Sequence, residues 1–266
     1  MTSDTNDNDR YLVPGLVRGV DILRLFTLEK RKLTMPEITA ALGIPRSTVH
    51  RLIVTLEHLQ LLQKDPYSPV YSLGSGLLRL GFQYIAQQDL VEIGRAHVDR
   101  LALDSGFSAQ LVIRDQAEVV VLHRAAGRSA FASALTVGSR LPAHATVLGR
   151  MLLINASYDE LLQVFGDGEL TRFTDETPKT LADLEGLLQA DRQRQYAVSE
   201  AAFEPGIHAI AAPVYGPDGT VVAAINITMG VGKNQFDKAP LVAMVRAQAQ
   251  QLSHHLGSPE QLGQVV

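Results

Sequence analysis

Two helical patterns joined by a very short connection constrain this chain more than any other feature. Apolar residues recur at helical spacing over residues 35–42 and again over residues 46–59, and Gly43 opens the connection between them. Glycine suits the left-handed conformation that ends many helices. Thr34 and Glu37 have the spacing of a capping box at the start of the first pattern. This arrangement is typical of a helix-turn-helix.

The helix predicted at residues 46–59 has one apolar face and one basic face. Its apolar residues are Val49, Leu52, Ile53, Leu56 and Leu59. The first residues of the last helix of a helix-turn-helix meet base edges in the major groove, where arginine pairs with guanine and hydroxyls reach bases or phosphates. A polar face that is only solvated is the alternative. The candidate DNA-contacting residues are Arg46, Ser47, Thr48, His50 and Arg51.

A further helix is expected ahead of this pair, over residues 15–28. Its apolar positions at helical spacing are Leu16, Val17, Val20, Leu23 and Phe26. The surrounding part of the chain is basic although the whole chain has a net charge of -4. Residues 10–80 carry ten Lys and Arg against five Asp and Glu, hence +5, while residues 1–9 contribute -3 and the rest -6. A basic module attached to an acidic partner is typical of a DNA-binding protein.

Short strand-like runs follow the predicted helix-turn-helix. They lie at residues 61–64 and 70–73 and flank the turn-forming segment Asp65–Pro69. This pattern predicts a hairpin that forms a wing beside the helices. Lys64 lies where a wing contacts the phosphate backbone, together with Tyr67 and Ser68 of the turn. The wing favours DNA binding over the solvated-face alternative.

The pattern changes beyond the wing. Residues 81–103 are predicted to be mostly helical, with a break at residues 87–89. Strands are expected at residues 108–113, 119–123, 131–135, 196–199, 207–213 and 220–228. Helices are expected at residues 146–154, 158–165, 181–195 and 236–255. Strands interrupted by a helical block and then resumed predict an α+β domain with an antiparallel sheet.

Several segments, in the same order, resemble one family, the IclR-type bacterial transcriptional regulators. They are LVRGVDIL at residues 16–23, PRSTVHRL at 45–52, YSLG at 71–74, LPAHATVLGR at 141–150, YAVSE at 196–200, EPGI at 204–207, IAAPV at 210–214 and AAINI at 223–227. The resemblance implies a winged helix-turn-helix, a helical linker and a GAF-like effector-binding domain. It also implies a homodimer or homotetramer that controls catabolic genes.

The domain bounds follow from these patterns. We expect a disordered tail at residues 1–12, a DNA-binding domain at 13–80, a helical linker at 81–105, an effector-binding and oligomerisation domain at 106–258 and a second tail at 259–266.

A small carboxylate, aliphatic or aromatic, is the expected effector. Thr146 can cap the helix after it and leave the amides of Val147, Leu148 and Gly149 unpaired, and helix N-termini favour anions. Asn226 and Thr228 lie two apart on a strand and so share a face; a polar edge or outer face of the sheet is the alternative for them. The resemblance places effector contacts at Val147, Leu148, Ser199, Ala209, Asn226 and Thr228.

Other function classes have weaker support. An enzyme is disfavoured because the chain lacks GxSxG, GxGxxG, a phosphate-loop lysine motif and HExxH. His123, His144 and His208 are scattered, so no metal or cofactor is expected. A second domain that only oligomerises is a further alternative. The chain has no cysteine, no secretory leader pattern and no apolar run of about 18 residues, so we expect a soluble cytoplasmic protein.

Overall fold

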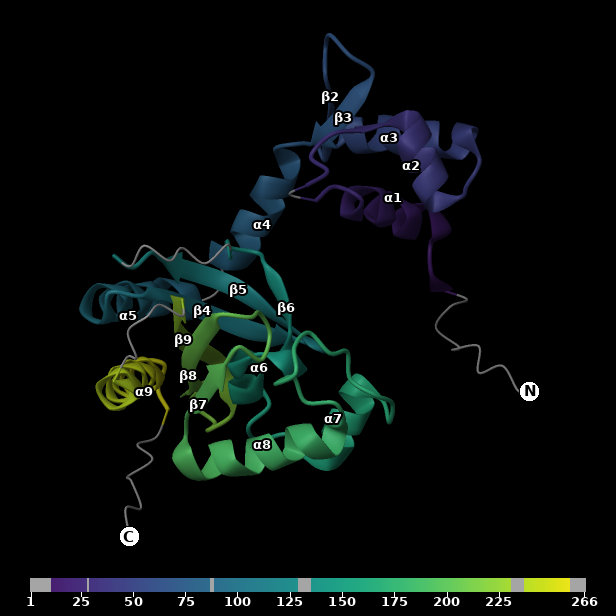
Figure 1. Cartoon of the computed structure of the whole chain (residues 1–266). Coiled ribbons are helices and arrows are strands. Elements are labelled where there is room, and N and C mark those ends of the chain that lie inside the picture. Colours follow the sequence, from purple (N-terminus) through teal and green to yellow (C-terminus); the bar gives the residue numbers. More distant parts are fainter. Residues whose placement is uncertain (1–10, 28, 87–88, 129–134, 231–236, 259–266) are drawn as a thin grey trace. The chain divides into compact units, whose positions relative to one another are not determined.

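The computed structural model describes residues 11–27, 29–86, 89–128, 135–230 and 237–258 (Figure 1). The chain divides into two compact units, residues 1–87 and 88–266, and the fold is mixed α+β. Most of the tail expected at residues 1–12, the tail expected at 259–266, residues 87–88 of the break expected at 87–89 and most of the strand expected at 131–135 lie outside the described residues.

The first unit is a helical bundle with a small sheet. Its helices are α1 (Pro14–Arg24), α2 (Met35–Leu42), α3 (Arg46–His58) and α4 (Gly76–Ala86), and its strands are β1 (Leu33–Thr34), β2 (Leu62–Lys64) and β3 (Val70–Leu73). The strand order is β1-β3-β2, and both pairs are antiparallel. The core includes Ile22, Ile38 and Ile53, one from each of the first three helices. This is the predicted winged helix-turn-helix.

The turn between α2 and α3 forms as its sequence predicts. The amide of Thr34 donates to a carboxylate oxygen of Glu37 over 2.7 Å, and the amide of Glu37 donates to the hydroxyl of Thr34 over 3.4 Å. Gly43 has a φ of 62°, the left-handed conformation that glycine adopts without strain. Both ends of α2 are therefore set by local chemistry, and this fixes where α3 begins.

The apolar face predicted for α1 divides into two. Ile22 and Phe26 are buried in the core, whereas Leu16, Val17 and Val20 have exposed fractions of 68%, 41% and 38%. These three side chains therefore do not face the core, which is met by the face of α1 on which Gly19 and Ile22 lie. The other apolar side chains form a stripe exposed on the surface of the unit.

The second unit contains a six-stranded antiparallel sheet of order β6-β5-β4-β9-β8-β7. Its strands are β4 (Ser108–Asp115), β5 (Glu118–Ala125), β6 (Arg140–Pro142), β7 (Ala197–Glu200), β8 (Ile207–Tyr215) and β9 (Val221–Gly230). Its helices are α5 (Asp89–Ser105), α6 (Val147–Leu152), α7 (Tyr158–Phe165), α8 (Leu181–Arg194) and α9 (Lys238–His255), with a 3-10 turn at Ala143–Ala145.

The helices cover the two faces of this sheet differently (Figure 1). Helices α5 and α9 lie on one face, where Val98 and Val245 belong to the same core as Ile225 of β9. Helices α6, α7 and α8 lie on the other face, where Met151 and Leu184 belong to a second core. The predicted connector segment that forms α5 is thus packed in the second unit.

Strand β6 was not predicted. It has only three residues, pairs with Glu118–Val120 at the edge of the sheet, and ends in Pro142. Proline has no amide proton to donate to a neighbouring strand and is tolerated mainly at such edges, so it argues against a strand in the sequence. Three residues are also too few to show the alternation that predicts a strand.

We expect the stability of the fold to fall on acidification, partly through three capping boxes. Hydrogen bonds from Thr34, Ser157 and Thr180 hold the pKa values of Glu37, Glu160 and Asp183 below their ordinary values. A lowered folded-state pKa gives stability that is present above the unfolded-state pKa and lost as pH falls through the folded-state pKa.

The measurement is the melting temperature from about pH 6 down to about pH 3, which spans the ordinary carboxyl range. The matched variant combines Glu37→Gln, Glu160→Gln and Asp183→Asn, which keep acceptor oxygens without the titrating group. The variant should lose less stability than the wild type over this range, and parallel pH profiles would show that the capping boxes do not contribute.

Candidate DNA interface and effector site

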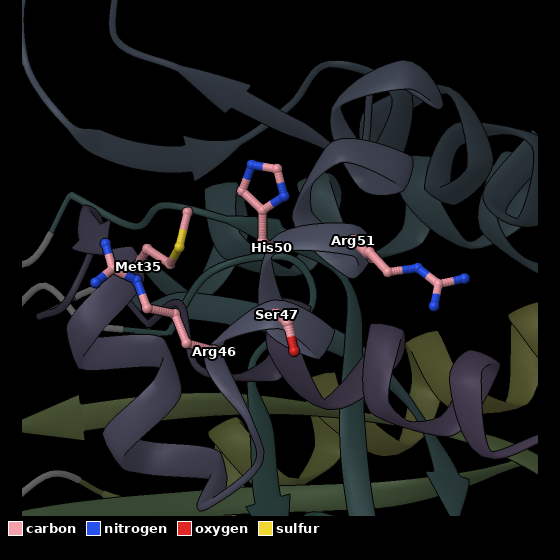
Figure 2. A pocket seen from close by; sticks show the side chains of 5 residues that line it. All are labelled: Met35, Arg46, Ser47, His50 and Arg51. Atoms are coloured by element: carbon pink, nitrogen blue, oxygen red, sulfur yellow. The ribbon is translucent and has the colours of Figure 1, made fainter.

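The basic face predicted for α3 is exposed in the structure. Arg46, Ser47, His50 and Arg51 are exposed and line a shallow hollow together with Met35, the first residue of α2. Figure 2 shows the four α3 side chains spreading over this surface rather than folding onto one another. Thr48 is half-buried and contributes less surface. The opposite face of α3 carries Val49, Ile53 and Leu56 into the core.

The cations on this surface are free of ion pairs within the described part of the chain. Among the described residues, Arg46, Arg51 and Lys64 form no ion pair, although ten ion pairs are formed elsewhere in those residues. Two arginines at the start of one helix, with a lysine on the adjacent hairpin, give a positive surface with donors for bases and phosphates.

The wing is held in shape at its base. The amide of Tyr67 donates to the carboxylate of Asp65 over 2.9 Å, and Lys32 forms an ion pair with Asp65 at 3.3 Å. These contacts hold the pKa of Asp65 below its ordinary value, with the bond from Tyr67 as the largest cause. Tyr67 is 97% exposed at the tip, and Lys64 is exposed on β2.

In the second unit, polar side chains gather on the sheet face that α6 covers. The strand register places Ser199, Ala209 and Thr228 side by side, and places Asn226 beside Ala211. Ala211 packs in the same core as Val147 and Leu148 of α6. Asn226 and Thr228 lie on a central strand and are 2% and 6% exposed. The alternative of a polar edge or outer face is therefore wrong.

Comparison with protein-family models covers both units. Residues 15–66 match the IclR helix-turn-helix domain, and residues 82–254 match the C-terminal domain of the bacterial transcriptional regulator IclR. The chain belongs to the IclR family. The members of this family are transcriptional regulators, and the enzyme alternative is set aside on that ground.

Individual IclR relatives match along most of their length. The glycerol operon regulatory protein of Streptomyces coelicolor is 31% identical over 250 residues, covering 92% of this chain and 97% of the relative. An IclR regulator from Alicyclobacillus acidocaldarius, solved as a crystal structure, is 27% identical with a TM-score of 0.81 and coverages of 93% and 100%. An IclR homologue from Microbacterium hydrocarbonoxydans, solved in complex with 4-hydroxybenzoate, shares the fold at 24% identity, a TM-score of 0.79 and coverages of 91% and 98%.

One effector contact expected in this IclR chain is corrected by the structure. The amide of Gly149 is not available to a ligand, because it donates to the hydroxyl of Thr146 over 3.1 Å. A β-carbon on Gly149 would lie 2.0 Å from the carbonyl oxygen of Ala143. Glycine at this position therefore permits the close approach of α6 to the preceding turn. The first amides of a helix have no acceptor within the helix, so the amides of Val147 and Leu148 are the remaining candidates for an anion at this end of α6.

Sequence reasoning missed Gln110, which lies opposite Asn226 on the neighbouring strand β4 and is 0% exposed. Alternation along residues 108–113 places Ser108, Gln110 and Val112 on one face, and this alternation was a usable signal for a polar residue pointing inward.

The three histidines do not converge. His123 contacts Asp99 at 2.8 Å, His144 contacts the carbonyl oxygen of Thr171 at 2.9 Å, and His208 lies on β8 opposite Glu200. Within the described residues no three potential metal ligands lie together. Likewise, no helix in that part of the chain combines the length and apolar character that crossing a membrane requires.

Proposed function

We propose that this IclR-family regulator binds double-stranded operator DNA through residues 13–80 and that a small carboxylate, bound within residues 106–258, changes its affinity for the operator. The observation that carries the DNA part is the exposed basic surface of α3, on which Arg46 and Arg51 form no ion pair among the described residues. The observation that carries the effector part is the buried polar group on the sheet face under α6.

We propose that Arg46, Ser47, Thr48, His50, Arg51 and Lys64 contact DNA. Their helix and hairpin belong to a module whose third helix enters the major groove in related folds. Bacterial DNA lies in the cytoplasm, so the proposed partner assigns the chain to that compartment.

Arg46→Ala and Arg51→Ala are expected to weaken operator binding by about 1–3 kcal/mol each if they contact bases, with relaxed preference at the contacted position. Lys64→Ala is the comparison, because loss of a phosphate contact weakens all sequences alike and reduces the salt slope by about one. Arg100→Ala on the exposed face of α5 is the matched control. Competition binding at fixed salt provides the measurement; unchanged affinity in both arginine variants contradicts the assignment.

We also propose that two copies act together on DNA. A single head presents one recognition helix and covers half of a symmetric site. The exposed stripe of α1, with Leu12 and Val13 just ahead of it, gives an apolar surface that a second copy would bury. Pairing of such dimers would give the homotetramer.

The proposed effector contacts are Val147, Leu148, Ser199, Ala209, Asn226 and Thr228. The 4-hydroxybenzoate complex of the Microbacterium homologue and the glycerol operon name of the Streptomyces relative support a small catabolic molecule as ligand, and catabolic genes as targets. The hydroxyl of Ser199 accepts from the amide of Ala202 over 3.1 Å, and its own proton remains for a ligand.

Asn226→Leu is expected to lower effector affinity about 5- to 100-fold while operator affinity without effector stays unchanged, because the buried amide is removed and the volume is nearly kept. Titrating small carboxylates with and without operator measures both. Linkage requires the operator to change effector affinity by the same factor as effector changes operator affinity. If no carboxylate stabilises the folded protein, the second unit only oligomerises.

A further inference from the structure

Three polar side chains form a row in the middle of the six-stranded sheet. Gln110 on β4 lies directly opposite Asn226 on β9, so the two side chains leave the same face of the sheet and are close neighbours. Thr228 follows two residues along β9 on that face. The exposed fractions of Gln110, Asn226 and Thr228 are 0%, 2% and 6%.

A hydrogen-bond relay runs through this row. Nδ2 of Asn226 donates to Oγ1 of Thr228 over 3.1 Å, and Oγ1 of Thr228 donates to Oε1 of Gln110 over 3.1 Å. The two ends of the relay, Oδ1 of Asn226 and Nε2 of Gln110, are buried and have no partner among the described residues. Because buried polar atoms are almost always paired, two unpaired ends on directly opposite residues of neighbouring strands indicate a place for a ligand group.

In the hydrogen-bond direction that the structure shows, the free ends are an acceptor on Asn226 and a donor on Gln110. If both amides are reversed, Nε2 of Gln110 donates to Thr228 and Thr228 donates to Oδ1 of Asn226, since the hydroxyl has a single proton to give. Either direction leaves one unpaired donor and one unpaired acceptor. A carboxylate only accepts and a methyl group does neither, whereas a hydroxyl group both donates and accepts.

We propose that Gln110 and Asn226 together bind a hydroxyl group of the effector, so that the effector is a hydroxylated small acid and Gln110 determines its selection. This inference rests on the proposed effector site on the same sheet face. Toward β7 that face is less buried, because Ser199 and Ala209 are half-buried while Gln110 is fully enclosed. The hydroxyl is therefore the inner end of the ligand and the carboxylate the outer end.

The test is calorimetric titration of the full-length chain with matched sets of acid, hydroxy acid and alcohol. The sets are acetate, glycolate and ethanol; butyrate, 4-hydroxybutyrate and 1-butanol; and benzoate, 4-hydroxybenzoate and phenol. In the set whose length fits, the hydroxy acid should bind about 10- to 100-fold tighter than the plain acid, which has no hydroxyl group to pair with Gln110 and Asn226 at its inner end.

The variant Gln110→Leu should abolish this preference by weakening the hydroxy acid alone. Gln189→Leu, the same change on the exposed face of α8, should retain it. If Gln110→Leu fails to fold, Thr228→Val breaks the relay at its centre and carries the same expectation.

The outcomes separate this inference from the proposed function. Equal binding of plain and hydroxy acid, or a preference that survives Gln110→Leu, overturns the role of Gln110 and leaves a carboxylate effector standing. Binding of the alcohol without either acid supports the hydroxyl site and overturns the carboxylate. Absence of binding throughout all three sets overturns both.

Discussion

Replacing Arg150 by Met is expected to destabilise the second unit by about 3–5 kcal/mol, since removing one partner of a buried ion pair leaves the other charge uncompensated. Nε and Nη2 of Arg150 in α6 donate to the two carboxylate oxygens of Asp191 in α8 over 2.8 and 3.2 Å. The side chains are 9% and 3% exposed. Nη2 also donates to the carbonyl oxygen of Val198 in β7 over 3.3 Å, so one guanidinium joins three elements.

The pH dependence of that loss identifies its cause. Burial raises the pKa of Asp191 above its ordinary value, although Arg150 opposes this. Without Arg150 the folded-state pKa rises further, and a raised folded-state pKa gives stability that is present at low pH and lost as pH rises through it. The deficit of Arg150→Met should therefore be smaller at about pH 4–5 than at about pH 7.

Two further variants complete the measurement, which is chemical denaturation of the full-length chain. Arg150→Met combined with Asp191→Leu should recover most of the stability, because no charge remains buried. Arg140→Ala, which breaks exposed ion pairs with Asp115 and Glu118, should cost no more than about 1 kcal/mol. A deficit of Arg150→Met that is small and independent of pH would contradict the assigned role of the pair.

The second large effect is expected from the apolar stripe of α1. Combining Leu16→Gln, Val17→Gln and Val20→Gln should separate the proposed pair of heads and lower operator affinity about 10³-fold or more, toward that of non-specific DNA. Burying each of these apolar side chains in the proposed interface stabilises the dimer by about 1.5–3 kcal/mol, and the variant loses this free energy in both copies. The substitutions are neutral, so electrostatic attraction to DNA is unchanged.

Sedimentation and operator titration measure this effect together. The head itself should keep its fold, because all three side chains are exposed within it. Leu103→Gln, an exposed apolar position on α5, is the control and should change neither quantity. A triple variant that binds operator as tightly as the wild type would show that α1 does not pair the heads.

Local chemistry explains which parts of the fold were predictable. Helix α2 has the predicted bounds because Thr34 and Gly43 determine its ends within the helix itself. The inner face of α1 was not predictable in the same way, because both its stripes are apolar and spacing alone does not say which one meets the core. Strand β6 escaped prediction because only its partner β5 makes it a strand.

The same distinction holds for the site. The basic start of α3 is visible in the sequence, since charge and helical spacing coincide there. The relay through Gln110 depends on the register between β4 and β9, which no local pattern specifies. Gly149 was expected to offer its amide to an anion, whereas tertiary packing against Ala143 and the Thr146 cap determine its role.

Selection of genomic DNA by the full-length chain measures operator recognition itself. Genomic fragments retained by the protein are sequenced, and their affinity is compared with that of scrambled fragments at one salt concentration. We expect two symmetric half-sites about one helical turn, or a multiple of it, apart, bound at least about 10³-fold tighter than scrambled DNA. Retained fragments that share no motif and bind no tighter than scrambled DNA would contradict operator recognition.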